Sequence, residues 1–157
     1  MTAKLVLSLA REKGIKIVTA ESCTGGLIAA TLTEVPGSSD VFDRGFVTYS
    51  NRAKQEMLGV QEKTLTDHGA VSEQVAYEMA ENALLRSGVG LAVSVTGIAG
   101  PGGSAFKPEG RVCFGLAQAR REVHTETVEF GAIGRNKVRM ATVDYALALL
   151  LSALRQR

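Results

Sequence analysis

The stretch Thr19–Leu27, TAESCTGGL, places two hydroxyls, a thiol and a carboxylate between an apolar run and a helix-like segment. Where a strand ends and a helix begins, the first helical N–H groups lack partners and point at the turn, so an anion or a developing oxyanion is stabilised there. Ser22 in this turn is a candidate nucleophile, and an ordinary helix cap is the alternative. We expect the N–H groups of Thr24, Gly25 and Gly26 to face a bound group, because glycines allow close approach.

A serine hydroxyl needs a base, and Lys54 in the segment TYSNRAK is the candidate. Asn51 is expected to cap the short helix NRAKQEMLG, which would place Lys54 one turn from its positive end. That position disfavours the charged ammonium and lowers the pKa of Lys54, so that a neutral amine can act as general base. Ser–Lys pairs are a known variant of the Ser–His arrangement, and a solvated surface lysine is the alternative.

Cys23 is the competing nucleophile, because a cysteine is intrinsically more reactive than a serine. A catalytic cysteine normally has a histidine beside it, but His68, expected in a polar loop, and His124, expected in a hairpin, lie outside the site segments. We therefore expect Ser22 to attack and Cys23 to pack as a small buried side chain. Neither histidine has partners at metal-ligand spacing, so the sequence favours neither a metal site nor a Ser-His-Asp triad.

The hydrophobic pattern predicts a scaffold of alternating helices and strands around these residues. Helical spacing predicts helices that end at Gly14, begin near Thr24, run from Ser72 to Ser87 and run from Arg135 to Leu154. Strand patterns cover Ile15–Ala20, Val41–Ser50, Leu91–Thr96 and the hairpin runs RVCFGLAQA and EVHTETVEF, which turn at Arg120 and Arg121. We predict one domain over residues 1–157, of class α/β: a three-layer α/β/α sandwich with a mixed, mostly parallel sheet of about five strands.

Three unusual segments, ESCTGG, TYSNRAK and TGIAGPGG, each follow one of the expected parallel strands. In such folds ligands bind beyond the carboxyl ends of those strands, so we expect the three segments to form one site. The glycine-rich segment matches neither the P-loop nor the dinucleotide-binding pattern, which counts against a nucleoside triphosphate or a dinucleotide.

Composition excludes several classes of partner. A chain of 157 residues with 45% hydrophobic and 22% charged residues and a net charge of +2 indicates a globular domain with neither a nucleic-acid nor a membrane partner. Two distant cysteines give no disulfide framework or zinc site and fit a reducing cytoplasm. Apolar helices at both termini leave a homodimer or larger homo-oligomer open.

Five ordered motifs carry a resemblance: TAESCTGG, GFVTYSNxxK, GAVS, VTGIAGPGG and KPEG. Together they resemble the CinA carboxy-terminal domain family, in its stand-alone short form, from about Val18 to Arg139. The resemblance implies hydrolysis of the carboxamide of nicotinamide mononucleotide to nicotinate mononucleotide and ammonia, in pyridine nucleotide salvage, with no metal or organic cofactor. It also implies a Ser/Lys mechanism, with Ser22 as nucleophile, Lys54 as base, Tyr49 relaying or orienting the proton, and Thr96 holding substrate or Lys54.

The phosphate of such a substrate needs donors of its own. The glycine-rich segment that includes Gly97 and Gly100 can supply N–H groups, and Arg135 or Arg139 can supply charge-assisted hydrogen bonds. Arg139 is preferred because it matches the family motif, and Glu21 is expected to bond ribose or to hold the turn. The expected substrate-binding set is Glu21, Thr24, Gly25, Gly26, Asn51, Gly97, Gly100 and Arg139.

Two other functions remain open. One is a catalytically silent nucleotide-binding or competence-related regulatory module, and the other is an amidohydrolase for a different small amide. Measuring ammonia release from nicotinamide mononucleotide would distinguish these two functions from the one that the resemblance implies.

Overall fold

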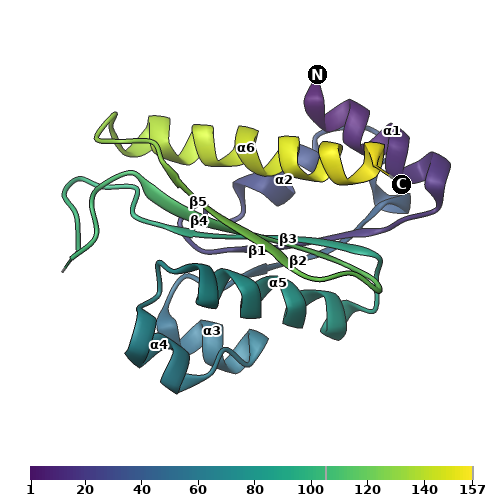
Figure 1. Ribbon diagram of the computed structural model, residues 1–157. Coiled ribbons are helices and arrows are strands. Elements are labelled where there is room, and N and C mark those ends of the chain that lie inside the picture. The colour runs from purple at the N-terminus through teal and green to yellow at the C-terminus, as the bar shows by residue number, and fades with distance from the viewer. Residues whose placement is uncertain (105, 157) are drawn as a thin grey trace.

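A five-stranded sheet forms the centre of the molecule, in the order β2-β1-β3-β4-β5 (Figure 1). The computed structural model describes residues 1–104 and 106–156. Its strands are β1 (Ile17–Glu21), β2 (Phe42–Val47), β3 (Leu91–Gly97), β4 (Arg111–Gln118) and β5 (His124–Glu129). β1 pairs in parallel with β2 and β3, whereas β4 is antiparallel to β3 and to β5. Only β4 therefore runs against the other strands, which confirms the predicted mixed sheet.

Helices cover both faces of this sheet (Figure 1). One face carries α1 (Thr2–Lys13), α2 (Leu27–Thr33) and α6 (Arg135–Arg155), and the other carries α3 (Asn51–Leu58), α4 (Glu62–His68) and α5 (Glu73–Ser87). Side chains alternate between the faces of a strand, so Ile17 of β1 joins the core beneath α6 and Val18 joins the core beneath α5. The predicted α/β/α sandwich is thus confirmed, with a hydrophobic core on each side of the sheet.

The helix that carries Lys54 is capped by a different residue from the one predicted. Ser50 has an extended backbone and its Oγ accepts a hydrogen bond from the N–H of Ala53 at 3.0 Å, while Asn51 is the first helical residue. The prediction that Asn51 caps this helix was wrong. Serine and asparagine are both favoured as caps, and the first helical turn begins at Asn51, so Ser50 occupies the cap position.

The second helix begins at Leu27 and not near Thr24. Gly25 and Gly26 have φ angles of 58° and 105°, which is left-handed backbone that glycine adopts without strain and that no α-helix contains. A separate turn therefore stands between β1 and α2, and it contains the candidate nucleophile.

A short helix, α4, was not predicted, and His68 is its last residue instead of part of a polar loop. Its buried residue is Leu65, so its sequence has too few apolar positions to show a helical period. The strand predicted over Val41–Ser50 is also shorter, since β2 ends at Val47 and the chain then leaves the sheet toward α3.

The loop between β3 and β4, residues 98–110, extends beyond the edge of the sheet (Figure 1). Its ends are joined by hydrogen bonds between Ile98 and Arg111 and between Gly110 and Ile98. Ala105, which belongs to the predicted irregular segment, lies outside the described residues. Within the described part of the chain, none of the helices combines the length and the hydrophobicity that crossing a bilayer requires.

Candidate active site

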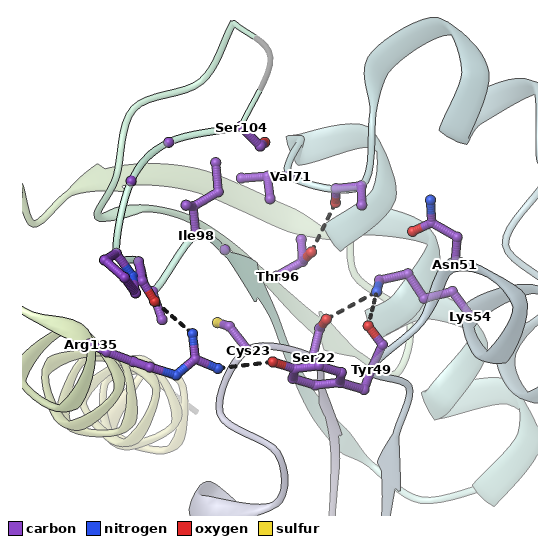
Figure 2. Close-up of a pocket in the computed structure, with 17 residues that line it drawn as sticks. Ser22, Cys23, Tyr49, Asn51, Lys54, Val71, Thr96, Ile98, Ser104 and Arg135 are labelled. Carbon is purple, nitrogen blue, oxygen red and sulfur yellow. Dashed lines mark hydrogen bonds between the residues drawn. The ribbon is translucent and has the colours of Figure 1, made fainter.

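Ser22 and Lys54 meet at the carboxyl edge of the parallel strands (Figure 2). Lys54 Nζ lies 3.0 Å from Ser22 Oγ and 3.0 Å from the carbonyl oxygen of Thr48, and a longer contact of 3.5 Å joins it to the carbonyl oxygen of Tyr49. Only 1% of Lys54 and 7% of Ser22 is exposed. The two residues expected to form a nucleophile and its base are therefore adjacent and shielded from water.

The surroundings of Lys54 favour a neutral amine. Burial lowers the pKa of Lys54 from 10.5 to about 8. A neutral amine has two N–H donors, which match the carbonyls of Thr48 and Tyr49, and one lone pair, which can accept the proton of Ser22. The lowered pKa was expected from the helix end, whereas the structure attributes it chiefly to burial.

The turn after β1 is fixed by the buried carboxylate of Glu21. It accepts hydrogen bonds from the hydroxyl of Thr24 and from the N–H groups of Ile28 and Ala29 at 2.9 and 3.0 Å. These N–H groups belong to the first turn of α2, where a carboxylate compensates the positive end of the helix. Of the two roles considered for Glu21, the contacts match the one that holds the turn.

Arg139 fixes the same turn from α6. Its guanidinium donates to the carbonyl of Cys23 at 3.1 Å and to that of Thr24 at 3.3 Å. The N–H of Gly25 is likewise occupied, since it donates to the carbonyl of Ser22 at 3.0 Å. Arg139 and Gly25 therefore support the backbone beside Ser22, and neither lines the pocket described below.

Cys23 lies beside Ser22 and its thiol faces the pocket (Figure 2). Burial raises the pKa of Cys23 to about 11, so the thiol stays protonated at neutral pH. Among the described residues, no side-chain base is hydrogen-bonded to this thiol, whereas Lys54 Nζ lies 3.0 Å from the hydroxyl of Ser22. This environment favours Ser22 over Cys23 as the nucleophile.

A pocket of about 380 Å³ opens above the Ser22–Lys54 pair. Its lining includes seven of the predicted site residues: Ser22, Tyr49, Asn51, Lys54, Thr96, Gly97 and Gly100. Five predicted residues are not in the lining: Glu21, Thr24, Gly25, Gly26 and Arg139. Arg135, which the sequence left as the alternative to Arg139, does line it.

Two predicted polar residues make contacts that differ from those expected. Thr96 Oγ1 donates to the carbonyl of Ala70 at 2.9 Å, which connects β3 to the segment between α4 and α5. The hydroxyl of Tyr49 accepts from Arg135 at 3.0 Å, and it has no hydrogen bond to Ser22 or Lys54 in the described structure. The roles proposed for these side chains stay predictions.

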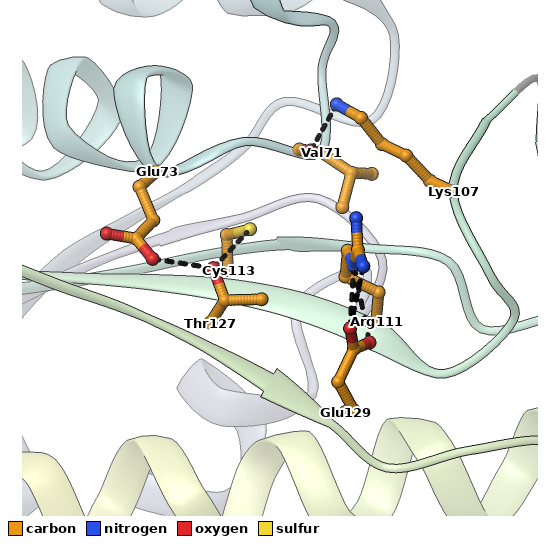
Figure 3. A network of polar contacts seen from close by, with 7 residues as sticks. All are labelled: Val71, Glu73, Lys107, Arg111, Cys113, Thr127 and Glu129. Carbon is orange, nitrogen blue, oxygen red and sulfur yellow. Dashed lines mark hydrogen bonds and ion pairs between the residues drawn. The ribbon is translucent and has the colours of Figure 1, made fainter.

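Sequence reasoning missed the acceptor for Lys54 and one wall of the pocket. The acceptor is the main-chain carbonyl of Thr48, which no side-chain pattern can reveal. The wall is the segment Ala70–Val71. The loop between β3 and β4 is attached to it, because Lys107 donates to the carbonyl of Val71 (Figure 3). Lys107 also donates to the carbonyl of His68, at the end of α4. The motif GAVS contains this wall and was the available signal.

At the base of the loop, a second set of polar contacts joins β5 to its neighbours (Figure 3). Arg111 and Glu129 form an ion pair at 2.7 Å across β4 and β5. The hydroxyl of Thr127 donates to Glu73 at the start of α5 at 2.7 Å. The loop, the pocket wall and the sheet are thereby connected to one another.

Fold and site together define an α/β/α protein with a buried Ser–Lys pair in a pocket beyond its parallel strands. The family model of the CinA C-terminal domain matches residues 1–154, and the chain belongs to this family.

Curated relatives are identical to this chain at about half of the aligned positions. The nicotinamide-nucleotide amidohydrolase PncC of Enterobacter agglomerans is 53% identical over 142 residues, which are 90% of this chain and 86% of that protein. PncC of Escherichia coli K12 is 51% identical over 141 residues, or 89% of this chain and 85% of that protein. A CinA-like protein of Chlorobium phaeobacteroides is 55% identical over 97% of this chain, but the chain spans only 37% of its length.

Solved structures show the same fold. The competence/damage inducible protein CihA of Agrobacterium tumefaciens superposes with a TM-score of 0.94 at 52% identity, covering 98% of this chain and 93% of that one. A CinA superfamily protein of Klebsiella pneumoniae gives a TM-score of 0.91 at 35% identity, covering 100% and 99% of the two chains.

Proposed function

We propose that this chain hydrolyses the carboxamide of nicotinamide mononucleotide to nicotinate mononucleotide and ammonia, as a step in pyridine nucleotide salvage. The observation that carries the proposal is the 3.0 Å contact between Ser22 Oγ and a buried Lys54 Nζ at the bottom of a pocket. The names of the two PncC relatives support the choice of amide.

The reaction proceeds through an acyl-enzyme. Ser22 Oγ attacks the carboxamide carbon while Lys54 Nζ accepts the hydroxyl proton, and the resulting ammonium then protonates the leaving nitrogen, which departs as ammonia. Water next attacks the ester carbon, Lys54 accepts a proton from it, and that proton returns to Ser22 Oγ as the acid leaves.

The tetrahedral intermediate needs donors for its oxyanion. Within the described residues, the N–H groups of Cys23 and Thr24 make no hydrogen bond to a backbone carbonyl, whereas the N–H of Gly25 does. We propose that the N–H groups of Cys23 and Thr24 donate hydrogen bonds to the oxyanion, because these two residues directly follow the nucleophile in the turn. Glu21 and Arg139 hold this turn and act on the reaction only through it.

The deciding experiment incubates the purified protein with nicotinamide mononucleotide and measures ammonia and nicotinate mononucleotide. Lys54→Met is the matched variant: it keeps the length of the side chain but removes the base, and we expect a loss of turnover on the order of a hundredfold or more. Near-normal turnover in that variant would remove Lys54 from the mechanism. Its circular dichroism spectrum controls for folding.

The same assay separates the two other functions. Binding of the mononucleotide without ammonia would indicate a regulatory module. Ammonia from another amide, with none from the mononucleotide, would indicate a different amidohydrolase.

A further inference from the structure

The Lys-Pro-Glu segment, residues 107–109, lies in the loop between β3 and β4 and takes no part in the proposed reaction. Neither Lys107 nor Glu109 lines the pocket that contains Ser22. Each of these two charged side chains nevertheless contacts a segment that does line it, and the two segments are different. One is the wall Ala70–Val71, and the other is the glycine-rich segment that follows β3.

Lys107 is attached to the wall between α4 and α5. Its Nζ donates to the carbonyl of Val71, as Figure 3 shows, and also to the carbonyl of His68. The carbonyl of Ala70 accepts from the hydroxyl of Thr96, which reaches it from β3. The main chain of this wall is therefore held from two sides, and Lys107 supplies the side that faces the loop.

Glu109 is attached to the glycine-rich segment. Its carboxylate accepts a hydrogen bond from the N–H of Gly102 at 2.5 Å. A Cβ at Gly100 would lie 2.6 Å from the carboxylate carbon of Glu109, and a Cβ at Gly103 would lie 2.4 Å from the carbonyl oxygen of Lys107. These distances are too short for a side chain, so the absence of one lets the two charged residues pack directly against this wall.

Hydrophobic burial contributes little to the position of this loop. Each of the described residues 101–104 and 106–109 is exposed or half-buried. Phe106, the large apolar side chain among them, is 98% exposed and so does not fasten the loop to the core. The placement of the loop against the two walls therefore depends on the hydrogen bonds of Lys107 and Glu109.

We propose that Lys107 and Glu109 are positioning residues, which hold the two walls of the pocket at the spacing that the substrate requires. Both act through main-chain groups of residues that line the pocket, and neither touches the reacting atoms. Their contribution therefore affects substrate binding and leaves the chemical step unchanged. The inference rests on the proposed function, because the substrate is nicotinamide mononucleotide.

The first test measures kcat and KM for that substrate in Lys107→Met, which keeps the length of the side chain without its N–H donors. Loss of these hydrogen bonds should raise KM on the order of threefold to tenfold and leave kcat within about twofold. Lys107→Arg restores N–H donors and should recover most of the affinity. Lys63→Met, which removes an exposed lysine from α4, is the matched control and should change neither constant.

The second test separates the hydrogen bond of Glu109 from its charge. Glu109→Met should raise KM in the same range, whereas Glu109→Gln keeps an acceptor oxygen for the N–H of Gly102 and should stay close to the unchanged protein. Glu122→Met, at an exposed glutamate between β4 and β5, is the matched control. A Glu109→Gln protein as impaired as Glu109→Met would contradict the role of this hydrogen bond.

Hydrogen exchange tests the two walls without substrate. Lys107→Met should speed amide exchange in residues 68–72 and Glu109→Met in residues 98–104, with β3 unchanged in both. Three results would overturn the inference: both Met variants with unchanged KM and exchange, a fall in kcat at unchanged KM, or no recovery in Lys107→Arg. If the unchanged protein released no ammonia, the proposed function would fail, and exchange would still decide whether these residues hold the walls.

Discussion

Lys54 has an unusual environment for a lysine, because 1% of it is exposed and its three partners are oxygens that carry no formal charge. Removing an ammonium from water without a carboxylate beside it costs free energy, and the protein avoids part of that cost when the amine is neutral. The residue is thereby prepared to accept a proton near neutral pH. Such a shift in a pocket beside a hydroxyl is typical of a catalytic base.

The pH dependence of turnover follows from that shift. Burial lowers the pKa of Lys54 to about 8, and only the neutral amine can accept the proton of Ser22. We expect kcat/KM for nicotinamide mononucleotide to rise as the pH approaches about 8 and to level off above it. A flat profile across the neutral and alkaline range would contradict the assignment. Cys23→Ala should give the same profile, because the thiol of Cys23, with a pKa of about 11, titrates at higher pH.

The free energy of unfolding should also rise with pH, because the pKa of Lys54 is lower in the folded protein than in the unfolded chain. The folded-state pKa of Lys54 is about 8 and its ordinary value is 10.5, so between these values the unfolded chain binds more protons than the folded one. The contribution of this residue to stability therefore rises with pH through that window. Urea unfolding across the window measures the slope, and Lys54→Met should reduce it.

At the scale of elements, the turn between β1 and α2 depends on a carboxylate from the strand before it. Glu21 ends β1 and accepts from Thr24 and from two N–H groups of the first turn of α2. This arrangement joins a strand and a helix through a single buried side chain. Ser22, which lies next to it, is thereby held toward Lys54.

Replacing that carboxylate should weaken both the fold and the reaction. Glu21→Gln removes the negative charge and brings an NH₂ group to a site where all three partners of the carboxylate are hydrogen-bond donors. We therefore expect a loss of about 1–3 kcal/mol in the free energy of unfolding, together with reduced turnover. Glu34→Gln, at the exposed C-terminal end of α2, is the control and should change stability by less than about 0.5 kcal/mol. Equal effects from the two variants would refute the role of Glu21.

The elements also show what the sequence could predict. Long amphipathic helices and buried strands rich in β-branched residues show a regular spacing of apolar residues in the sequence. The sandwich and its mixed sheet were therefore predictable. Arg135 and Arg139 could not be separated, because residues four apart lie on the same face of a helix and only tertiary contacts distinguish them. The helix α4 has a single buried residue, Leu65, and therefore had no pattern to detect.

At the scale of the whole molecule, the helix α5 lies very close to the sheet. The hydroxyl of Ser94 on β3 donates to the carbonyl of Ala76 on α5 at 2.6 Å, and Gly115 on β4 lies beside both groups. A Cβ at Gly115 would come within 2.5 Å of each. The absence of a side chain there allows α5 to pack on the sheet, and the segment leading into α5 forms a wall of the pocket.

Gly115→Ala should therefore displace α5 and lower the free energy of unfolding by about 1–3 kcal/mol. Activity should fall as well, because the segment that leads into α5 forms a wall of the pocket and would move with the helix. Thermal unfolding and ammonia release measure the two effects. Gly88→Ala is a useful comparison, because a Cβ there meets no atom within 4 Å and the cost comes only from its φ of 69°. If Gly115→Ala left both stability and activity unchanged, the close packing of α5 would not matter.

The central claim is that Ser22, activated by Lys54, attacks the carboxamide of nicotinamide mononucleotide. The most direct test compares ammonia release from that substrate by Ser22→Ala and Cys23→Ala, two truncations at adjacent positions in the same turn. We predict that Ser22→Ala loses turnover by on the order of a thousandfold or more, and that Cys23→Ala retains most of it. An active Ser22→Ala protein together with an inactive Cys23→Ala protein would contradict the account.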